Sequence, residues 1–384
     1  MHICGSFDVY IKDEDDECSP DCINKREVDN YYTREEVNAL LAQKQDVLTK
    51  QDIIDLLGYK ETLLSMETCD GTVSYHSVLA KEIPVVKTVL FTDGTLIINE
   101  LASDRAADTA LHGVVTNIYP PLDESHDYNF NNYTDVYWYS ERLAITSVKF
   151  GSPVQPTKTA NWFANHSNLV SVDTQNLDTS NVNSMGFMFY KCVSLTTIDV
   201  SQWDTSNVTG FGSMFEQCEV LSQLDVSNWD TGKVTTLNYM FYKCQTLTAL
   251  DVSNWDTKNV TNMGSVFYKC INLASIDVSN WNTQNVNRMG DMFRECQEVT
   301  SLDLSNWDTS GVTIMYNMFN KCNKLKTIYA SDKFVVAQVT ESYSMFNQCY
   351  VLKGGNGTTY TSSHQDKEYA RIDAPGTPGY FTEA

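Results

Sequence analysis

A spacing of 26 residues dominates the second half of this 384-residue chain. It separates consecutive cysteines from Cys192 to Cys322, and Cys349 follows after 27 residues. Five tryptophans, from Trp203 to Trp307, keep the same interval. A fixed period of this length is typical of a solenoid, in which each coil supplies one element to a shared core. We therefore expect the function to lie on a surface of the solenoid and not in a catalytic pocket.

Each repeat divides into a short strand, a polar turn and a compact final turn. The unit at residues 221–244 reads LSQLDVSNWDTGKVTTLNYMFYKC. The alternation at Leu224-Asp225-Val226 predicts a strand, and the polar residues after the tryptophan favour a turn. The closing M-F-x-x-C pattern predicts one helical or 3₁₀ turn that faces the core. No single coil can bury its apolar side alone, so the repeats must stack.

Stacking places equivalent side chains above one another, at about the inter-strand distance of 4.8 Å. The cysteines then form a row, which we interpret as small buried apolar groups in a tight corner. Disulfides between adjacent coils are the alternative, although a row of seven leaves one thiol unpaired. His166 occupies the equivalent position one coil earlier, and no histidine accompanies the cysteines as a metal ligand.

The pattern L-x-x-L-D-V-S-N-W-D-T-S-N-V-T-x-M-x-x-M-F-x-x-C resembles BspA-like leucine-rich repeats, found on surface proteins of gut and oral bacteria and of their phages. The resemblance covers about residues 143–384. It implies an α/β-type leucine-rich repeat solenoid with 26-residue coils. Residues 151–353 are then the repeats and residues 354–384 a C-terminal cap. Leu177, Val266 and the segment 332–339 depart from the pattern.

The composition of the chain excludes some classes of partner and indicates the compartment in which it assembles. A net charge of −22 and a pI near 4.5 argue against nucleic acid and anionic lipid. The chain has no run of 18 apolar residues, so we expect no membrane insertion. The N-terminus does not resemble a secretory signal, which suggests assembly in a reducing host cytoplasm and release by phage lysis. The alternative is that a preceding signal has been removed.

Residues 1–32 are polar and acidic, and we interpret them as an anchoring segment that becomes ordered on docking to other virion proteins. The alternative is a zinc site formed by His2, Cys4, Cys18 and Cys22. Only the last two of these residues have a spacing typical of zinc ligands.

Residues 33–66 predict two short helices, which begin at the N-caps Thr33 and Thr49. Helices of about 10 residues do not persist alone in water. Their apolar seam consists of Val37, Leu40, Val47 and Ile54. The stretch YTREEVNALLAQKQD resembles a segment near the start of phage fibre proteins, in which three chains associate, and so implies a homotrimer. The alternative is that the helices fold against their own cap domain.

Residues 67–84 are expected to be a linker, and residues 85–150 a β-rich cap over the first coil. Strands at Val86–Phe91 and Leu96–Asn99 flank Asp93-Gly94, which predicts a hairpin. Covering the first coil would protect its open edge from pairing with other chains. The aromatic cluster in this region is expected to pack on the first repeat, with sugar binding as the alternative.

No pattern in the chain indicates catalysis. The six histidines share no motif with a nucleophile or a metal pair, and neither a phosphate loop nor the HExxH or GxSxG motif is present. We therefore expect no enzyme activity, no catalytic residue and no cofactor. A pair of carboxylates for glycoside cleavage is the alternative that sequence alone leaves open.

A row of aspartates lies on the outward side of the predicted strands: Asp173, Asp199, Asp225, Asp251, Asp277 and Asp303. Stacked carboxylates repel one another unless something offsets their charge. We favour local hydrogen bonds from serine or threonine hydroxyls and backbone N–H groups. The alternative is that the row from Asp199 onward binds Ca²⁺ or a cationic ligand. A second aspartate series, which includes Asp204 and Asp230, predicts Asx-type turns.

A surface that recognises a specific ligand is expected to use positions that vary from one repeat to the next. The candidate ligand-binding residues lie at variable or aromatic positions of the final turn: Tyr190, Tyr239, Tyr242, Tyr268, Asp291 and Asn317. Tyrosine is a favoured anchor at interfaces. These features predict a non-enzymatic phage virion fibre, of head or tail, that binds a glycan or protein of the bacterial host. The alternative is a BspA-like adhesin on the surface of a bacterial cell.

Overall fold

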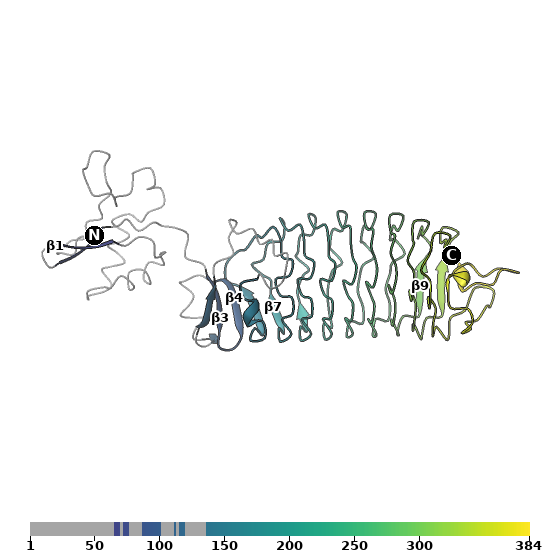
Figure 1. Ribbon diagram of the computed structural model, residues 1–384, viewed down its shortest axis with the longest axis horizontal. Helices are drawn as coiled ribbons and strands as arrows, with labels where there is room; N and C mark the ends of the chain where they lie inside the picture. Colours follow the sequence, from purple (N-terminus) through teal and green to yellow (C-terminus); the bar gives the residue numbers. More distant parts are fainter. Residues whose placement is uncertain (1–64, 70–71, 77–86, 101–110, 113–114, 120–135) are drawn as a thin grey trace, which may run out of the picture.

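The computed structural model describes residues 65–69, 72–76, 87–100, 111–112, 115–119 and 136–384. The predicted anchoring segment, the zinc alternative and both predicted helices lie outside these residues, apart from the last two positions of the 33–66 segment. Within them, the repeats form coils that lie side by side along the long axis (Figure 1). No helix in the described ranges has the length and apolar character needed to cross a membrane.

The short strands of the coils pair in parallel along the solenoid, in one sheet near its start and another near its end. The strands near the start are β3 (Lys87–Phe91), β4 (Thr95–Glu100), β5 (Val115–Tyr119), β6 (Ser147–Phe150), β7 (Ser171–Asp173) and β8 (Thr197–Ile198), in the order β5-β3-β4-β6-β7-β8. Near the end are β9 (Ser301–Leu304), β10 (Thr327–Ala330) and β11 (Phe381–Glu383). Isolated parallel bridges such as Ala249↔Ser275 continue the row between these two groups. In β9 the burial alternates, as the sequence pattern predicts.

The core consists of side-chain rows that follow the solenoid axis. Adjacent indoles from Trp203 to Trp281 have ring centroids 6.1–6.4 Å apart and planes within 6° of parallel. From Trp229 to Trp307, each Nε1–H donates to a valine carbonyl 29 residues earlier, at 3.0–3.2 Å. These bonds tie each coil to its predecessor, and they confirm that equivalent residues lie above one another.

The seven predicted core cysteines are buried free thiols. Each Sγ donates to the carbonyl of a phenylalanine in the preceding coil, at 2.9–3.2 Å. Burial raises the pKa of Cys270 and of Cys349 to about 12. The interpretation of the cysteines as small buried groups is confirmed, and the row is also a set of hydrogen-bond donors.

The predicted helical turn at the end of each repeat is wrong. Residues 136–384 contain no α-helix, and their two 3₁₀ helices, η3 (Tyr139–Glu141) and η4 (Lys367–Tyr369), lie outside the repeats. In the coil that ends at Cys192, the N–H groups of Met188 and Tyr190 close local turns, whereas those of Phe187 and Phe189 bond to the next coil. A helix would use all of these groups within its own segment. The turn is therefore part of the bonding between coils.

This arrangement requires left-handed backbone at two residues of each final turn. Sixteen non-glycine residues have φ between 53° and 66°, spaced four apart within a coil, as at Phe187 and Lys191. A positive φ at the third residue is the requirement of a type II turn. Some side chains at these positions are exposed, such as Phe187 and Tyr239, whereas Ser213, Ser265 and Asn317 are buried. Three of these positions, Tyr239, Asp291 and Asn317, are candidate ligand-binding residues.

Strands β3 and β4 continue the sheet beyond the first coil, because β4 pairs in parallel with β6. Their antiparallel hairpin is confirmed: Leu90 pairs with Leu96, and Gly94 has a φ of +86°. The ring of Trp138 is fully buried and donates Nε1–H to the carbonyl of Trp162 at 3.0 Å. The predicted cap over residues 85–150, much of which lies outside the described ranges, stays a prediction.

The segment expected to be a linker contains regular structure. Strands β1 (Ser65–Cys69) and β2 (Thr72–His76) form an antiparallel hairpin, which also includes the end of the segment predicted to be helical. The sequence carries the signal for this hairpin, because Asp70-Gly71 separates two runs that contain strand-forming residues.

Candidate functional site

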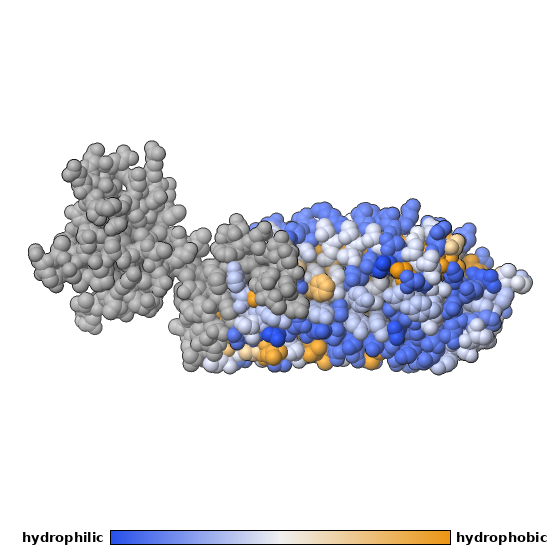
Figure 2. All heavy atoms as spheres, in the orientation of Figure 1, coloured by the Kyte–Doolittle hydropathy of each residue, from blue (hydrophilic) through white to orange (hydrophobic). Residues whose placement is uncertain are grey.

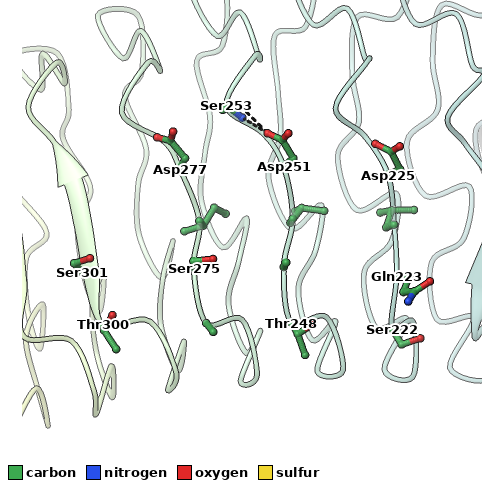
Figure 3. Close-up of a pocket in the computed structure, with 15 residues that line it drawn as sticks. Ser222, Gln223, Asp225, Thr248, Asp251, Ser253, Ser275, Asp277, Thr300 and Ser301 are labelled. Atoms are coloured by element: carbon green, nitrogen blue, oxygen red, sulfur yellow. Dashed lines mark hydrogen bonds between the residues drawn. The ribbon is translucent and has the colours of Figure 1, made fainter.

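The aspartate row lies on the exposed face of the sheet, beside an open hollow of about 790 Å³. Asp225, Asp251 and Asp277 point the same way from successive coils, above smaller polar side chains such as Ser275 (Figure 3). The hollow exists because the coils place only small or medium side chains there, including Ala249. At the two ends of the aspartate row the equivalent positions hold larger residues. Lys149 pairs with Asp173 at one end, and Tyr329 pairs with Asp303 at the other.

Local hydrogen bonds hold the aspartates of this row, as predicted. In Asp251, Oδ1 accepts from the backbone N–H of Ser253 at 3.1 Å and from its hydroxyl at 2.7 Å. Asp199, Asp225 and Asp277 are held in the same way. The hydroxyl and N–H of the serine two residues on hold the pKa of Asp199 and Asp277 below the usual range. Each charge is therefore stabilised within its own coil.

The calcium alternative for this row gains no support from the geometry. Among the residues that the structure describes, no three His, Cys, Asp or Glu side chains lie close enough to share a metal ion. The second aspartate series forms the predicted Asx turns. For example, Asp204 Oδ1 accepts the backbone N–H of Ser206, and Asp230 Oδ1 accepts that of Gly232.

A second surface is formed by the final turns of the coils, and we call it the turn strip. It consists of three rows: Phe187, Ser213, Tyr239, Ser265, Asp291, Asn317 and Ser344; Tyr190, Glu216, Tyr242, Tyr268, Arg294, Asn320 and Asn347; Lys191, Gln217, Lys243, Lys269, Glu295, Lys321 and Gln348. The first and third rows are residues with left-handed backbone. All six candidate ligand-binding residues belong to this strip.

The structure brings three of the predicted tyrosines into contact. The rings of Tyr239 and Tyr242 meet edge to face with centroids 5.9 Å apart, and Tyr242 and Tyr268 are 4.8 Å apart across two coils. Tyr239 is 40% exposed. Tyr190 lies two coils before Tyr242 and pairs instead with the ring of Phe187, at 5.7 Å. The aromatic part of the strip therefore has two clusters, separated by the coil of Glu216.

Cations flank the rings of Tyr190, Tyr242 and Tyr268. The Nζ atoms of Lys191, Lys243 and Lys269 lie 4.9–5.6 Å from the ring centroid of the tyrosine that precedes each of them. Arg294 lies over the Tyr268 ring at 4.8 Å, and its Nη1 is 3.0 Å from Asp291 Oδ1. Contacts of this kind orient a cation at a partly exposed ring.

The remaining candidate, Asn317, is buried, and its Oδ1 accepts from Asn320 Nδ2 at 2.8 Å. Its side chain is committed to the turn itself. Asp291 is half-buried and pairs with Arg294, which lies over the Tyr268 ring. The assignment of these six residues to ligand binding stays a prediction.

Electrostatics set the centre of the strip apart from the surrounding surface. Burial raises the pKa of Glu216, while the Ser213 and Gln217 side chains and the lysines on either side favour its charged form. Burial also raises the pKa of Tyr242 and Tyr268, so both phenols are neutral at pH 7. The centre of the strip is thus partly desolvated, and its neutral rings lie among cations and the carboxylate of Glu216.

Glu216, Lys269 and Arg294 are not among the residues predicted from the sequence. A signal for each was present: Glu216 and Arg294 occupy the tyrosine position of the 26-residue repeat. In the units that end at Cys192, Cys244 and Cys270, a lysine follows the tyrosine. The position directly before the cysteine therefore indicates where the cations lie. The contact of Arg294 with Tyr268 depends on the register between coils, which the repeat period does not give.

The repeats match a known family. A family model described as "Mycoplasma protein of unknown function, DUF285" matches residues 157–249 and 238–356, which together span more than half of the chain. The chain belongs to the DUF285 family. This family is one of BspA-like repeats, so the resemblance noted in the sequence is confirmed. No curated protein matches the chain.

Two solved leucine-rich repeat structures are distantly similar to this DUF285 protein. A leucine-rich repeat protein from Eubacterium ventriosum ATCC 27560 shares 14% identity, with 71% of this chain and 98% of that chain covered and a TM-score of 0.25. The TLR13–ssRNA13 complex shares 14% identity, with 54% and 35% covered and a TM-score of 0.22. The match thus spans about a third of the TLR13 chain. The hydrogen bonds between coils, and not these likenesses, establish the fold.

Proposed function

We propose that this DUF285 protein is a non-enzymatic attachment protein, a fibre of a phage virion, which presents the turn strip to the surface of a bacterial host. One observation carries the proposal. The buried positions carry similar residues from coil to coil, whereas the positions of the turn strip vary. At its centre the strip presents a cluster of partly exposed rings and cations around Tyr239, Tyr242 and Tyr268. Aromatic residues with an adjacent charge are the common anchors of recognition surfaces.

The virion part of the proposal draws on the N-terminal third. The segment at residues 33–66 would associate three chains, residues 1–32 would anchor them to other virion proteins, and the repeats would extend outward. A bacterial cell-surface adhesin is the second candidate, since the matching family model is described for a cellular organism, Mycoplasma. Peptides of this chain in purified virions would support the first function, and peptides in washed cell envelopes would support the second.

Attachment is tested by binding of the labelled full-length protein to intact cells from a panel of gut and oral bacteria. The double variant Tyr239→Ala/Tyr242→Ala is expected to reduce binding to a recognised strain at least tenfold. Tyr329→Ala is the matched control, because this tyrosine is 41% exposed but lies on the sheet. Equal binding by the double variant and the control would contradict the proposal. Release of new sugar ends from the cell envelopes would contradict its non-enzymatic part.

A further inference from the structure

The turn strip contains more cations than carboxylates, whereas the chain as a whole is strongly negative. Its three rows hold five cations, Lys191, Lys243, Lys269, Arg294 and Lys321, against the three carboxylates Glu216, Asp291 and Glu295. The whole chain has a net charge of −22. An anionic ligand is therefore repelled by most of the surface and attracted along this strip. The sheet face, with its aspartate row, favours the opposite charge.

The cations of the turn strip differ in whether they form an ion pair with a carboxylate. Lys243 lies 3.7 Å from Glu219, Arg294 lies 3.0 Å from Asp291, and Lys321 lies 3.3 Å from Glu295. Lys269 makes no ion pair with any residue of the described part of the chain, and its Nζ lies 5.4 Å from the ring centroid of Tyr268. An incoming anion would meet Lys269 without first displacing a carboxylate from it.

The exposed apolar surface of the strip is aromatic and narrow. Its large exposed side chains are Phe187 and Tyr239, and none of its three rows contains Leu, Ile, Val or Met. A stable protein interface needs about 1,600 Å² with a well-packed apolar centre. A polysaccharide needs less width, since a sugar ring presents polarised C–H groups to the electron-rich face of one aromatic ring. Figure 2 shows a mainly hydrophilic surface with small, separate apolar patches on the face in view.

We propose that the turn strip binds an acidic polysaccharide, whose sugar rings stack at the tyrosine cluster and whose anionic groups contact Lys269. This inference rests on the proposed attachment function and names its ligand class. Because the coils repeat along one axis, an extended polymer can follow the strip from one aromatic cluster to the other. The cations that flank Tyr190 and Tyr242 then lie along its path.

The test measures binding of the full-length protein to three immobilised acidic polymers and to a neutral counterpart of each. The pairs are polygalacturonate and hyaluronan, each with its methyl ester, and dextran sulfate with dextran. At least one acidic polymer is expected to bind at least tenfold more tightly than its counterpart, and more weakly as salt concentration rises. The proposal is overturned if all three acidic polymers fail this comparison.

Variants locate the site. Lys269→Gln and Tyr239→Ala are each expected to weaken binding of the acidic polymer at least fivefold. The controls Lys258→Gln and Tyr329→Ala, at an exposed lysine and an exposed tyrosine outside the strip, are expected to change it less than twofold. If the strip variants behave like the controls, the strip is not the site and the proposal fails.

Cell binding separates this inference from the attachment function. Loss of binding after protease treatment of the cells, with no competition by the acidic polymer, would identify a protein receptor. That result overturns the polysaccharide and leaves attachment standing. Conversely, strip-dependent binding to the polymer, without binding to any strain of the panel, supports the ligand class and counts against attachment.

Discussion

At the scale of single residues, contacts with the preceding coil determine which side chains the solenoid accepts. The thiol of Cys244 donates to the Phe215 carbonyl, and the indole of Trp255 donates to the Val226 carbonyl. Both acceptors are buried, and each carbonyl also accepts a backbone N–H of its own coil, so the side-chain donor is its second partner. A cysteine in this row therefore fills a small volume and also adds a hydrogen bond between coils.

The left-handed residues of the final turn give a test at the same scale. Gln217 has a φ of 62°, a conformation that costs an L-residue about 1–2 kcal/mol and a β-branched residue more. Gln217→Gly is expected to match or exceed the wild-type free energy of unfolding, and Gln217→Val to lower it by about 2 kcal/mol. Urea denaturation measures both values.

The control uses an exposed position on the sheet face. Ser222 is not among the left-handed residues, and its N–H bonds to the Thr196 carbonyl of the preceding coil. Strand-like backbone favours valine over glycine, so the order of the Ser222→Gly and Ser222→Val variants should be reversed. If Gln217→Val were as stable as the wild-type protein, backbone strain at this turn would be ruled out.

At the scale of elements, the first coil differs from its neighbours in several core residues, and one of them is ionisable. His166 replaces the cysteine of the repeat and is fully buried, with Nδ1 3.2 Å from the Ala164 carbonyl and Nε2 without a hydrogen-bond partner. Desolvation lowers the pKa of His166 to about 4, and the charge of Arg142 acts in the same direction. The coil next to the β3–β4 strands thus requires a neutral imidazole.

The stability of this protein should consequently depend on pH through His166. In the unfolded chain the pKa of histidine is about 6.5. The contribution of His166 is complete above that pH and is lost as pH falls toward 4, because the unfolded state binds a proton that the folded state excludes. Between pH 7 and pH 5, the wild-type free energy of unfolding should fall by about 2 kcal/mol more than that of His166→Cys. Parallel pH profiles from urea denaturation would contradict this.

The sequence predicted most of the repeated elements, because their period reports the stacking directly. The short strands, the Asx turns at Asp204 and Asp230, and the hairpin at Gly94 follow from local chemistry and are present. The helical turn was wrong for a physical reason. Apolar residues three and four apart suit a helix and also two successive turns, and local spacing does not reveal that every second N–H bonds to the next coil.

The candidate site was predictable to a smaller extent. The variable positions of the repeat placed Tyr239, Tyr242 and Tyr268 on one surface, and the structure brings their rings together. The contact of Arg294 with Tyr268 arises between coils, so it depends on the register of stacking. The burial of Asn317 likewise involves the next coil, since Asn320, which bonds to it, accepts a hydrogen bond from Asn347 of that coil.

At the scale of the whole molecule, the ends of the solenoid matter as much as its middle. The last coil is followed by β11, which pairs in parallel with β10 through Ile328↔Phe381. Ile372 bridges to Phe381 on the same strand, and the buried ring of Tyr380 packs beside Phe346. An open edge of a parallel sheet can pair with another chain. At this end β11 is the edge strand, and the bridge from Ile372 covers part of it. We expect the association of chains to use other residues.

The N-terminal segment is where we expect that association. If residues 33–66 join three chains, light scattering of the full-length protein should give three times the chain mass of 43.4 kDa. The double variant Val37→Glu/Leu40→Glu should give the single-chain mass, because charges on the apolar seam are disfavoured in a helical core. Val170→Glu, at an exposed apolar residue of the solenoid, is the control and should leave the oligomer unchanged. If the wild-type protein has the single-chain mass, the hypothesis of a trimeric fibre is wrong. The main argument for a virion protein over a cell-surface protein is then lost as well.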